Sequence, residues 1–193
     1  FRAAAQVYAR RCPPVDGRLF NYGEGFADFL VDFEPAAELP YLAGVACLDR
    51  CWSEAHVAAD QPCLGAASIA GCSPSELAGL FLTRHPAARW RWFEGQPIYT
   101  LWRVNREHGE LPEPLPWLGE GALLTRPSGD VRWQPVDAAG VLFLNACHQG
   151  LPLGQAGQRV VERWPGADLA ALMATLLNAG AFVAGELSLN PDE

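Results

Sequence analysis

Proline limits the length of the helices that the first third of this chain can form, because its ring cannot be accommodated beyond the first helical turn. Pro13-Pro14 end a helix predicted over residues 1–12, whose spacing indicates that it continues from further upstream. Pro35 closes a second helix with an apolar stripe of Phe26, Phe29, Leu30 and Phe33. Pro40 suits the first turn of a third helix, which we expect to run to about residue 59.

A loop over residues 61–71 separates this helical part from the rest of the chain. The loop is rich in small residues, and we place a domain boundary there, between residues 1–72 and residues 73–193. Beyond the boundary, Ser73 begins a short helical turn, and residues 77–83 are predicted to form a strand that ends at His85-Pro86. Residues 98–106 fit either a short helix or a strand.

A β-hairpin is the clearest element of the second predicted domain. Residues 122–126 and 131–136 flank a Pro-Ser-Gly-Asp sequence whose composition suits a tight turn. Asp137 is a good N-cap for a helix to about residue 148, and two further helices are predicted over 154–163 and 166–178. A final strand is expected over 181–189. This order predicts an α+β fold, an N-terminal helical segment followed by a small sheet with helices in a winged-helix-like order.

Arginine and tryptophan alternate strictly at Arg89, Trp90, Arg91 and Trp92. In a strand, both Arg would point one way and both Trp the other. Three interpretations are open: a half-buried strand with its Trp face in the core, a surface that offers the Arg pair to an acidic protein or peptide, and a site where single-stranded nucleic acid stacks on Trp. The net charge of −8 makes nucleic acid the least favoured partner, because its affinity comes largely from cations that neutralise phosphates.

The composition is that of a globular protein. Half of the residues are hydrophobic and 19% are charged, which separates the chain from disordered sequences. No segment approaches the roughly 20 consecutive apolar residues of a membrane span, and no signal peptide opens the chain. We therefore expect a cytoplasmic protein without a membrane partner.

The cysteines and histidines are scattered rather than arranged as a metal site. The six cysteines show no C-x-x-C pair and no zinc-type spacing with histidine, so we predict reduced thiols and no metal in this chain. Cys47 and Cys51 are one helical turn apart. Together with Gly44, Ala55 and Ala58 they form a stripe of small residues, which we interpret as a face where another helix packs closely.

Asp49 and His56 lie on the opposite face of that helix, with Trp52 between them. A carboxylate and an imidazole could act as an acid and a base, but no nucleophile accompanies them. Cys147 and His148 are adjacent, and helical neighbours point in different directions. We therefore predict structural hydrogen bonding at Asp49 and no catalytic residue in this chain.

The segments NYGEGFADFL (21–30) and LPYLAGVACLDRCWSEAHVAAD (39–60) resemble a family of small bacterial proteins, the HvfC and BufC group, which carries the label DNA-binding. LFLTRHPAARW (80–90), LWR (101–103), the hairpin and the Asp137-capped helix follow in the same order. The usual family member has a further helical segment upstream, so the chain is most similar to the shorter MbnC-type subunits of methanobactin biosynthesis.

This resemblance implies a non-catalytic partner subunit that binds an MbnB-like oxidase, a TIM-barrel protein with several iron ions. The subunit would recognise a ribosomal precursor peptide through its leader segment, and oxygen would convert peptide cysteines to oxazolone and thioamide groups. Iron is expected in the partner, and no cofactor is expected in this chain. The alternatives are a DNA-binding regulatory protein and, more remotely, an enzyme that uses Asp49 and His56.

An exposed sheet edge can take up such a peptide as an added strand, with backbone hydrogen bonds supplying the affinity. The candidate edges are the hairpin over 122–136 and the final strand over 181–189. The residues expected to bind the peptide or the partner are Arg89, Trp90, Arg91, Trp92, Leu123, Thr125, Trp133, Phe182 and Val183.

Overall fold

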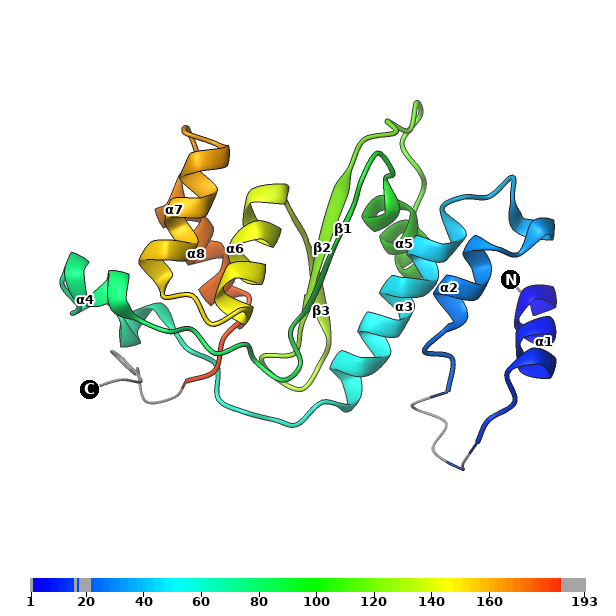
Figure 1. Ribbon diagram of the computed structural model, residues 1–193, viewed down its shortest axis with the longest axis horizontal. Helices are drawn as coiled ribbons and strands as arrows, with labels where there is room; N and C mark the ends of the chain where they lie inside the picture. The colour runs from blue at the N-terminus through cyan, green and yellow to red at the C-terminus, as the bar shows by residue number, and fades with distance from the viewer. Residues whose placement is uncertain (1, 16, 18–21, 185–193) are drawn as a thin grey trace. The chain divides into compact units, whose positions relative to one another are not determined.

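The computed structural model describes residues 2–15, 17 and 22–184, and within them the α+β class is confirmed (Figure 1). The helices are α1 (Arg2–Arg11), α2 (Phe26–Val31), α3 (Leu42–Val57), α4 (Pro74–Gly79), α5 (Ile98–Glu107), α6 (Ala138–His148), α7 (Leu153–Arg163) and α8 (Leu169–Asn178), with 3-10 turns η1 (Glu34–Ala36) and η2 (Ala66–Ser68). Strands β1 (Arg89–Phe93), β2 (Glu120–Thr125) and β3 (Arg132–Val136) form one sheet in the order β1-β2-β3.

The chain forms two compact units, and each is assembled from two separate stretches of sequence. Residues 1–54 and 93–120 make the first unit, and residues 55–92 and 121–193 make the second. The domain boundary expected between residues 72 and 73 falls inside the second unit. The chain also returns to the first unit at residue 93, and no change of composition in the sequence indicates this return.

In the first unit, α1 and α2 meet through aromatic rings. The Tyr8 ring contacts Phe26 and Phe29 edge-on, with centroid distances of 5.2 and 5.4 Å, and Phe29 packs against Phe33 at 5.1 Å. The predicted stripe of α2 is therefore confirmed. Edge-to-face rings of this kind add to the free energy gained from burial of their area.

Helix α5 packs against the small-residue face of α3 at Gly44. The sequence predicted that another helix would pack closely on this face. A Cβ atom placed on Gly44 would lie 2.8 Å from Cδ1 of Ile98, so only glycine allows this close approach. Cys51 and Ala55 on the same stripe are almost fully buried. The segment that fitted either a helix or a strand is thus a helix, fixed by its contact with α3.

Helix α5 ends at a residue in a backbone conformation that favours glycine. His108 occupies the C-cap position with φ 55° and ψ 34°, in the left-handed region, and Gly109 N–H donates to the Val104 carbonyl. A side chain with a Cβ atom is strained there.

We expect His108→Gly to raise the free energy of unfolding by about 0.5–1 kcal/mol, because glycine adopts this conformation without strain. Chemical denaturation of both proteins measures the change. His108→Ala is the matched control, since alanine keeps the Cβ atom and should not stabilise. An equal gain in both variants would show that loss of the imidazole, and not relief of strain, is responsible.

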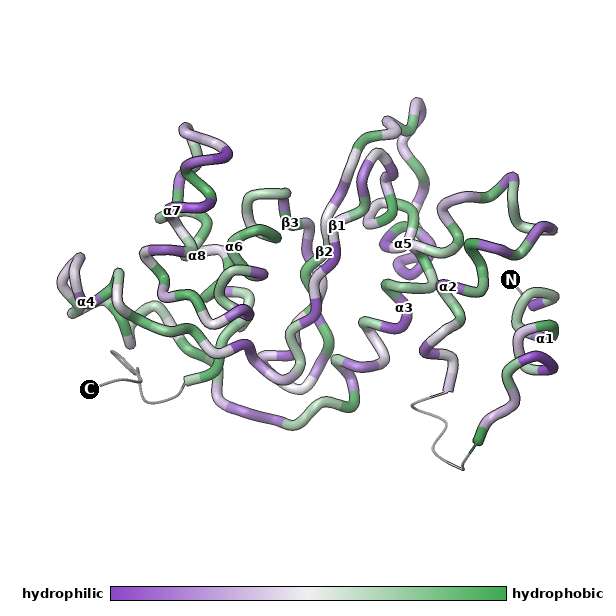
Figure 2. The backbone as a smooth tube through the Cα atoms, in the orientation of Figure 1, coloured by the Kyte–Doolittle hydropathy of each residue, from purple (hydrophilic) through white to green (hydrophobic). Residues whose placement is uncertain are grey.

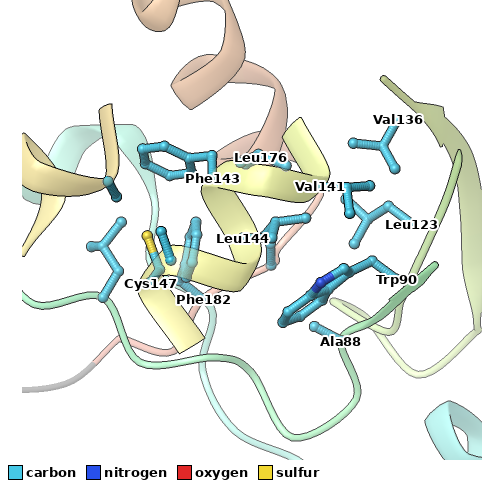
Figure 3. Packing of buried hydrophobic residues seen from close by; sticks show 14 of the residues in the cluster. Ala88, Trp90, Leu123, Val136, Val141, Phe143, Leu144, Cys147, Leu176 and Phe182 are labelled. Carbon is cyan, nitrogen blue, oxygen red and sulfur yellow. The ribbon is translucent and has the colours of Figure 1, made fainter. Parts of the chain in front are cut away.

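In the second unit, α6 lies against the sheet and α7 lies against α6 (Figure 1). Figure 3 shows Trp90 of β1 and Leu123 of β2 facing Val141 and Leu144 of α6. As predicted, Asp137 caps α6, and its Oδ1 accepts from Gly140 N–H at 2.7 Å. Along α7, hydrophilic and hydrophobic segments alternate, as the tube in Figure 2 shows. This amphipathic pattern matches a helix with one face in the core.

The strand predicted over residues 77–83 is wrong. Ser73 and Glu76 form a capping box, which starts α4 and carries the helix through Gly79. The N-terminal half of the predicted strand is therefore helical. The following residues are extended, but they pair only at an isolated bridge between Arg84 and Phe182.

The predicted final strand is reduced to isolated β-bridges at Phe182 and Val183 in its described part, and residues 185–189 lie outside the described residues. Residues 181–184 are hydrogen-bonded on both sides. Leu64 N–H donates to Phe182 O at 2.9 Å and Ala184 N–H to Pro62 O at 2.7 Å. On the other side, His85 N–H donates to Ala181 O and Val183 N–H to Thr83 O, at 2.9 and 3.0 Å. This described part is a connector hydrogen-bonded on both sides, with Ala181 and Phe182 buried, and not an open edge.

His85 holds the same junction with its side chain. Its ring is 1% exposed, Nδ1 accepts from Ala87 N–H at 3.1 Å, and Nε2 lies 2.9 Å from Gln61 O. Because a carbonyl can only accept, Nε2 is the donor in its contact with Gln61.

We expect His85→Ala to lower the free energy of unfolding by about 2–5 kcal/mol, because it strands the Ala87 N–H and the Gln61 carbonyl and leaves a cavity. Equilibrium denaturation measures this loss. His148→Ala is the control, since His148 is exposed at the end of α6. A loss at His85 no larger than the loss at His148 would contradict the assigned role.

Candidate binding site at the sheet edge

Strand β3 forms one edge of the sheet. It pairs antiparallel with β2, in a register that sets Leu123 opposite Gln134 and Thr125 opposite Arg132. Within the described residues its other side has no strand. Pro135, which has no N–H to give to a ladder, is exposed in β3, and proline in sheets is confined to edge strands and bulges.

Strand β1 forms the other edge, but its own arginines cover part of its backbone. Arg89 Nη1 donates to Ala88 O at 2.9 Å and to Pro86 O at 2.7 Å, and Arg91 Nη1 donates to Trp90 O at 2.8 Å. Ala88 and Trp90 are two residues apart, so their carbonyls point to the same side of the extended chain. A peptide that paired with these two carbonyls would have to displace both guanidinium groups.

Trp90 belongs to the core and not to an accessible surface. It is 7% exposed, and its Nε1 donates to Asn145 Oδ1 of α6 at 2.8 Å. Arg91 is exposed and Arg89 and Trp92 are half-buried. Of the three interpretations of the Arg/Trp alternation, the half-buried strand is the one confirmed.

The other expected binding residues divide into buried and accessible ones. Leu123 and Thr125, at 1% and 3% exposure, lie on the central strand β2, and Phe182 is 1% exposed in the buried connector. Their side chains cannot contact a partner in this structure. Trp133 of β3 and Val183 are half-buried. The structure does not bring the nine residues together at one surface, and that they bind a peptide or partner stays a prediction.

The Trp90 to Asn145 hydrogen bond ties β1 to α6, and no sequence signal pairs two residues so far apart. We expect Asn145→Ala to lower the free energy of unfolding by about 1–2 kcal/mol, because the buried indole N–H loses its acceptor. Thermal or urea denaturation measures it. The control is Asn105→Ala, which removes only a hydrogen bond to Leu101 O one turn away on α5. Equal losses would refute a special role for the Asn145 bond.

Asp49 makes structural contacts, as predicted. Its Oδ1 accepts from Trp102 Nε1 at 2.8 Å and lies 3.6 Å from Arg106 Nη1. The Arg106 guanidinium carbon lies 4.0 Å from the centre of the Trp52 ring. These contacts tie the Asp49 carboxylate to α5.

Cys147 and His148 do not form a nucleophile and its base. Burial raises the pKa of Cys147 to about 12, so the thiol stays protonated at neutral pH and is a poor nucleophile. The His148 ring is turned to the Trp90 ring, with centroids 5.9 Å apart.

The part of the chain that the structure describes contains no group of three or more His, Cys, Asp or Glu side chains placed to hold a metal ion. None of the helices in this part has the length and apolar character that crossing a bilayer requires.

A scan of the sequence against protein-family models gave no match, and a search among curated proteins gave none either. The resemblance to MbnC-type subunits therefore remains an expectation from the sequence.

Proposed function

We propose that this chain is a cytoplasmic, non-catalytic partner subunit that binds an extended ribosomal precursor peptide along β3 and presents it to an iron-dependent TIM-barrel oxidase. The observation that carries the proposal is the position of β3 at the edge of the sheet, with β2 on one side. The oxidase, its iron and the conversion of peptide cysteines to oxazolone and thioamide groups come from the resemblance to MbnC-type subunits.

An added strand on β3 would obtain affinity from backbone hydrogen bonds and register from neighbouring side chains. Arg132 and Pro135 are exposed, and Trp133 and Gln134 are half-buried. The single missing donor at Pro135 limits which alignments of the peptide can pair fully. Proline on an edge strand also opposes pairing with a second copy of the chain.

The alternative, a DNA-binding regulatory protein, is disfavoured by charge. The chain carries 14 basic and 22 acidic residues, which gives the net charge of −8. At least six of the basic residues are already held in hydrogen bonds to backbone or carboxylate groups: Arg50, Arg84, Arg89, Arg91, Arg103 and Arg126. A gel-shift titration at low salt separates the two functions, because a DNA-binding protein would bind and lose affinity steeply as salt is raised.

The addition of a strand can be tested on the peptide, without altering the fold of the protein. Every second N–H group of an added strand faces β3, and the N–H groups between them face away. N-methylation of the residues whose N–H groups face β3 should therefore abolish binding. N-methylation of the alternate residues should preserve it. Calorimetry of the two analogues measures this. In hydrogen exchange, the unmethylated peptide should slow exchange of β3 amides and leave β2 unchanged. Equal binding of both analogues, or protection at β1 instead, would overturn the assignment.

The role beside an oxidase has its own test. The chain should co-elute with an iron-dependent TIM-barrel oxidase of this class, and oxidation of the peptide cysteines, followed by mass spectrometry, should require both proteins. The isolated chain should show no turnover of the peptide. Tight iron binding and peptide oxidation by this chain alone would refute a non-catalytic role, whichever edge the peptide uses.

A further inference from the structure

An open hollow of about 390 Å³ lies between the loop after α3 and the hairpin turn after β2. Its lining comes entirely from the second unit: Asp60, Gln61, Pro62, Arg126, Pro127 and Gly129. Gly129, at φ +94°, completes the hairpin turn, and Pro127 packs against the close approach at Gly180. Both walls of the hollow are therefore anchored to the core of this unit.

Arg126 is the cationic residue of this lining, and its side chain is only 10% exposed. Its Nη2 donates to the carbonyl of Ala58, just beyond the end of α3, and lies 3.0 Å from Oδ1 of Asp60. The carbonyls at the end of a helix lack partners within the helix, so the Ala58 contact holds the guanidinium group in place.

Only part of the hydrogen-bonding capacity of the Arg126 guanidinium group is used. Its Nε is buried and has no hydrogen-bond partner among the described residues. Asp60 is 84% exposed on its side chain, and the distance recorded for it is to Nη2. A carboxylate matched to the planar fork of Arg would accept from Nε and Nη2 together, which is the strong arrangement for this pair. Asp60 does not supply it, and a buried donor is left unsatisfied.

We propose that the Arg126 hollow is a binding site for a ligand carboxylate, which displaces Asp60 and accepts from both Nε and Nη2 of Arg126. Asp60 is the side chain that can leave, since an exposed ion pair contributes little to stability. The ligand carboxylate takes the place of Asp60 beside Nη2, next to the unpartnered Nε. The carboxylate belongs to a small organic acid or to an acidic side chain of a peptide. This site is independent of strand addition at β3, because it requires neither the peptide's backbone nor the oxidase.

The charge balance favours a carboxylate over a phosphate. A carboxylate carries one negative charge and pairs one-to-one with Arg126. A phosphate monoester carries between one and a half and two negative charges at neutral pH. It would leave uncompensated charge next to Asp60, in a lining with one cation.

The test follows the Nε–H signal of Arg126 in ¹H–¹⁵N NMR spectra during titration with sodium acetate, against sodium chloride at equal ionic strength. The signal is assigned by its loss in Arg126→Lys. Acetate should move it downfield in a saturable way, and chloride should not. If Arg126→Lys does not fold, assignment through the bonds of the arginine side chain replaces it, and the titration remains decisive.

The matched variants are Asp60→Asn and Asp130→Asn. Both remove one negative charge near the hairpin turn, but Asp130 does not line the hollow. Asp60→Asn should tighten acetate binding about fivefold, because it removes the competing partner of Arg126. Asp130→Asn should change it by less than about twofold, since exposed charges at longer range are screened. If both variants changed acetate affinity equally, the change would reflect the net charge of the protein alone, and the proposal would be overturned.

Two more ligands identify the source of the carboxylate. A blocked Gly-Glu-Gly peptide that shifts the signal at lower concentration than acetate would assign the hollow to an acidic peptide side chain. Stronger binding of acetate would assign it to a small organic acid. The blocked Gly-Gln-Gly peptide should be silent. The proposal would be overturned if inorganic phosphate shifted the Nε–H signal at the same concentration as acetate. It would also be overturned if no carboxylate gave a saturable shift.

Discussion

The second unit depends on the hydrogen bonds around residues 181–184. This short segment joins the loop at residues 62–64 to the segment at residues 83–85, so three distant parts of the chain meet in one buried place. Phe182, at 1% exposure, and Ala181, at 0%, fill the interior there. Buried backbone groups are costly without partners, and each of these finds one only in the complete unit. The sheet, α6 and the Arg126 hollow all adjoin elements that this junction fixes.

The two sheet edges differ for physical reasons that bear on function. At β1 the guanidinium groups of Arg89 and Arg91 donate to carbonyls of the strand's own backbone or its neighbour. At β3 the protection is a single proline, which removes one donor and leaves the remaining backbone groups of the edge strand in place.

The first unit shows how polar residues on a helix can resemble an active site and serve packing instead. Asp49 and Trp52 of α3 are engaged by Trp102 and Arg106 of α5, through a hydrogen bond and a cation–π contact. A carboxylate that accepts from a buried indole orients one helix on the other. Contacts of this type favour one relative rotation of the two helices.

The sequence alone determined the elements whose signals are local. The Asp137 cap, the Pro127-to-Asp130 turn, the Phe stripe of α2 and the alternation in β1 all depend on residues within a few positions of one another, and each is confirmed. Tertiary structure decided the rest. The capping box at Ser73 overrode the apolar run that suggested a strand, and residues 181–184 are hydrogen-bonded from both sides instead of forming an open edge.

The sequence also could not place Leu123 and Thr125 on a central strand, pair Trp90 with Asn145, or bring Arg126 to Asp60. Those positions depend on which strand lies between which neighbours and on contacts across more than fifty residues. Such contacts form only when the whole unit closes, because the entropy of the intervening chain must first be overcome.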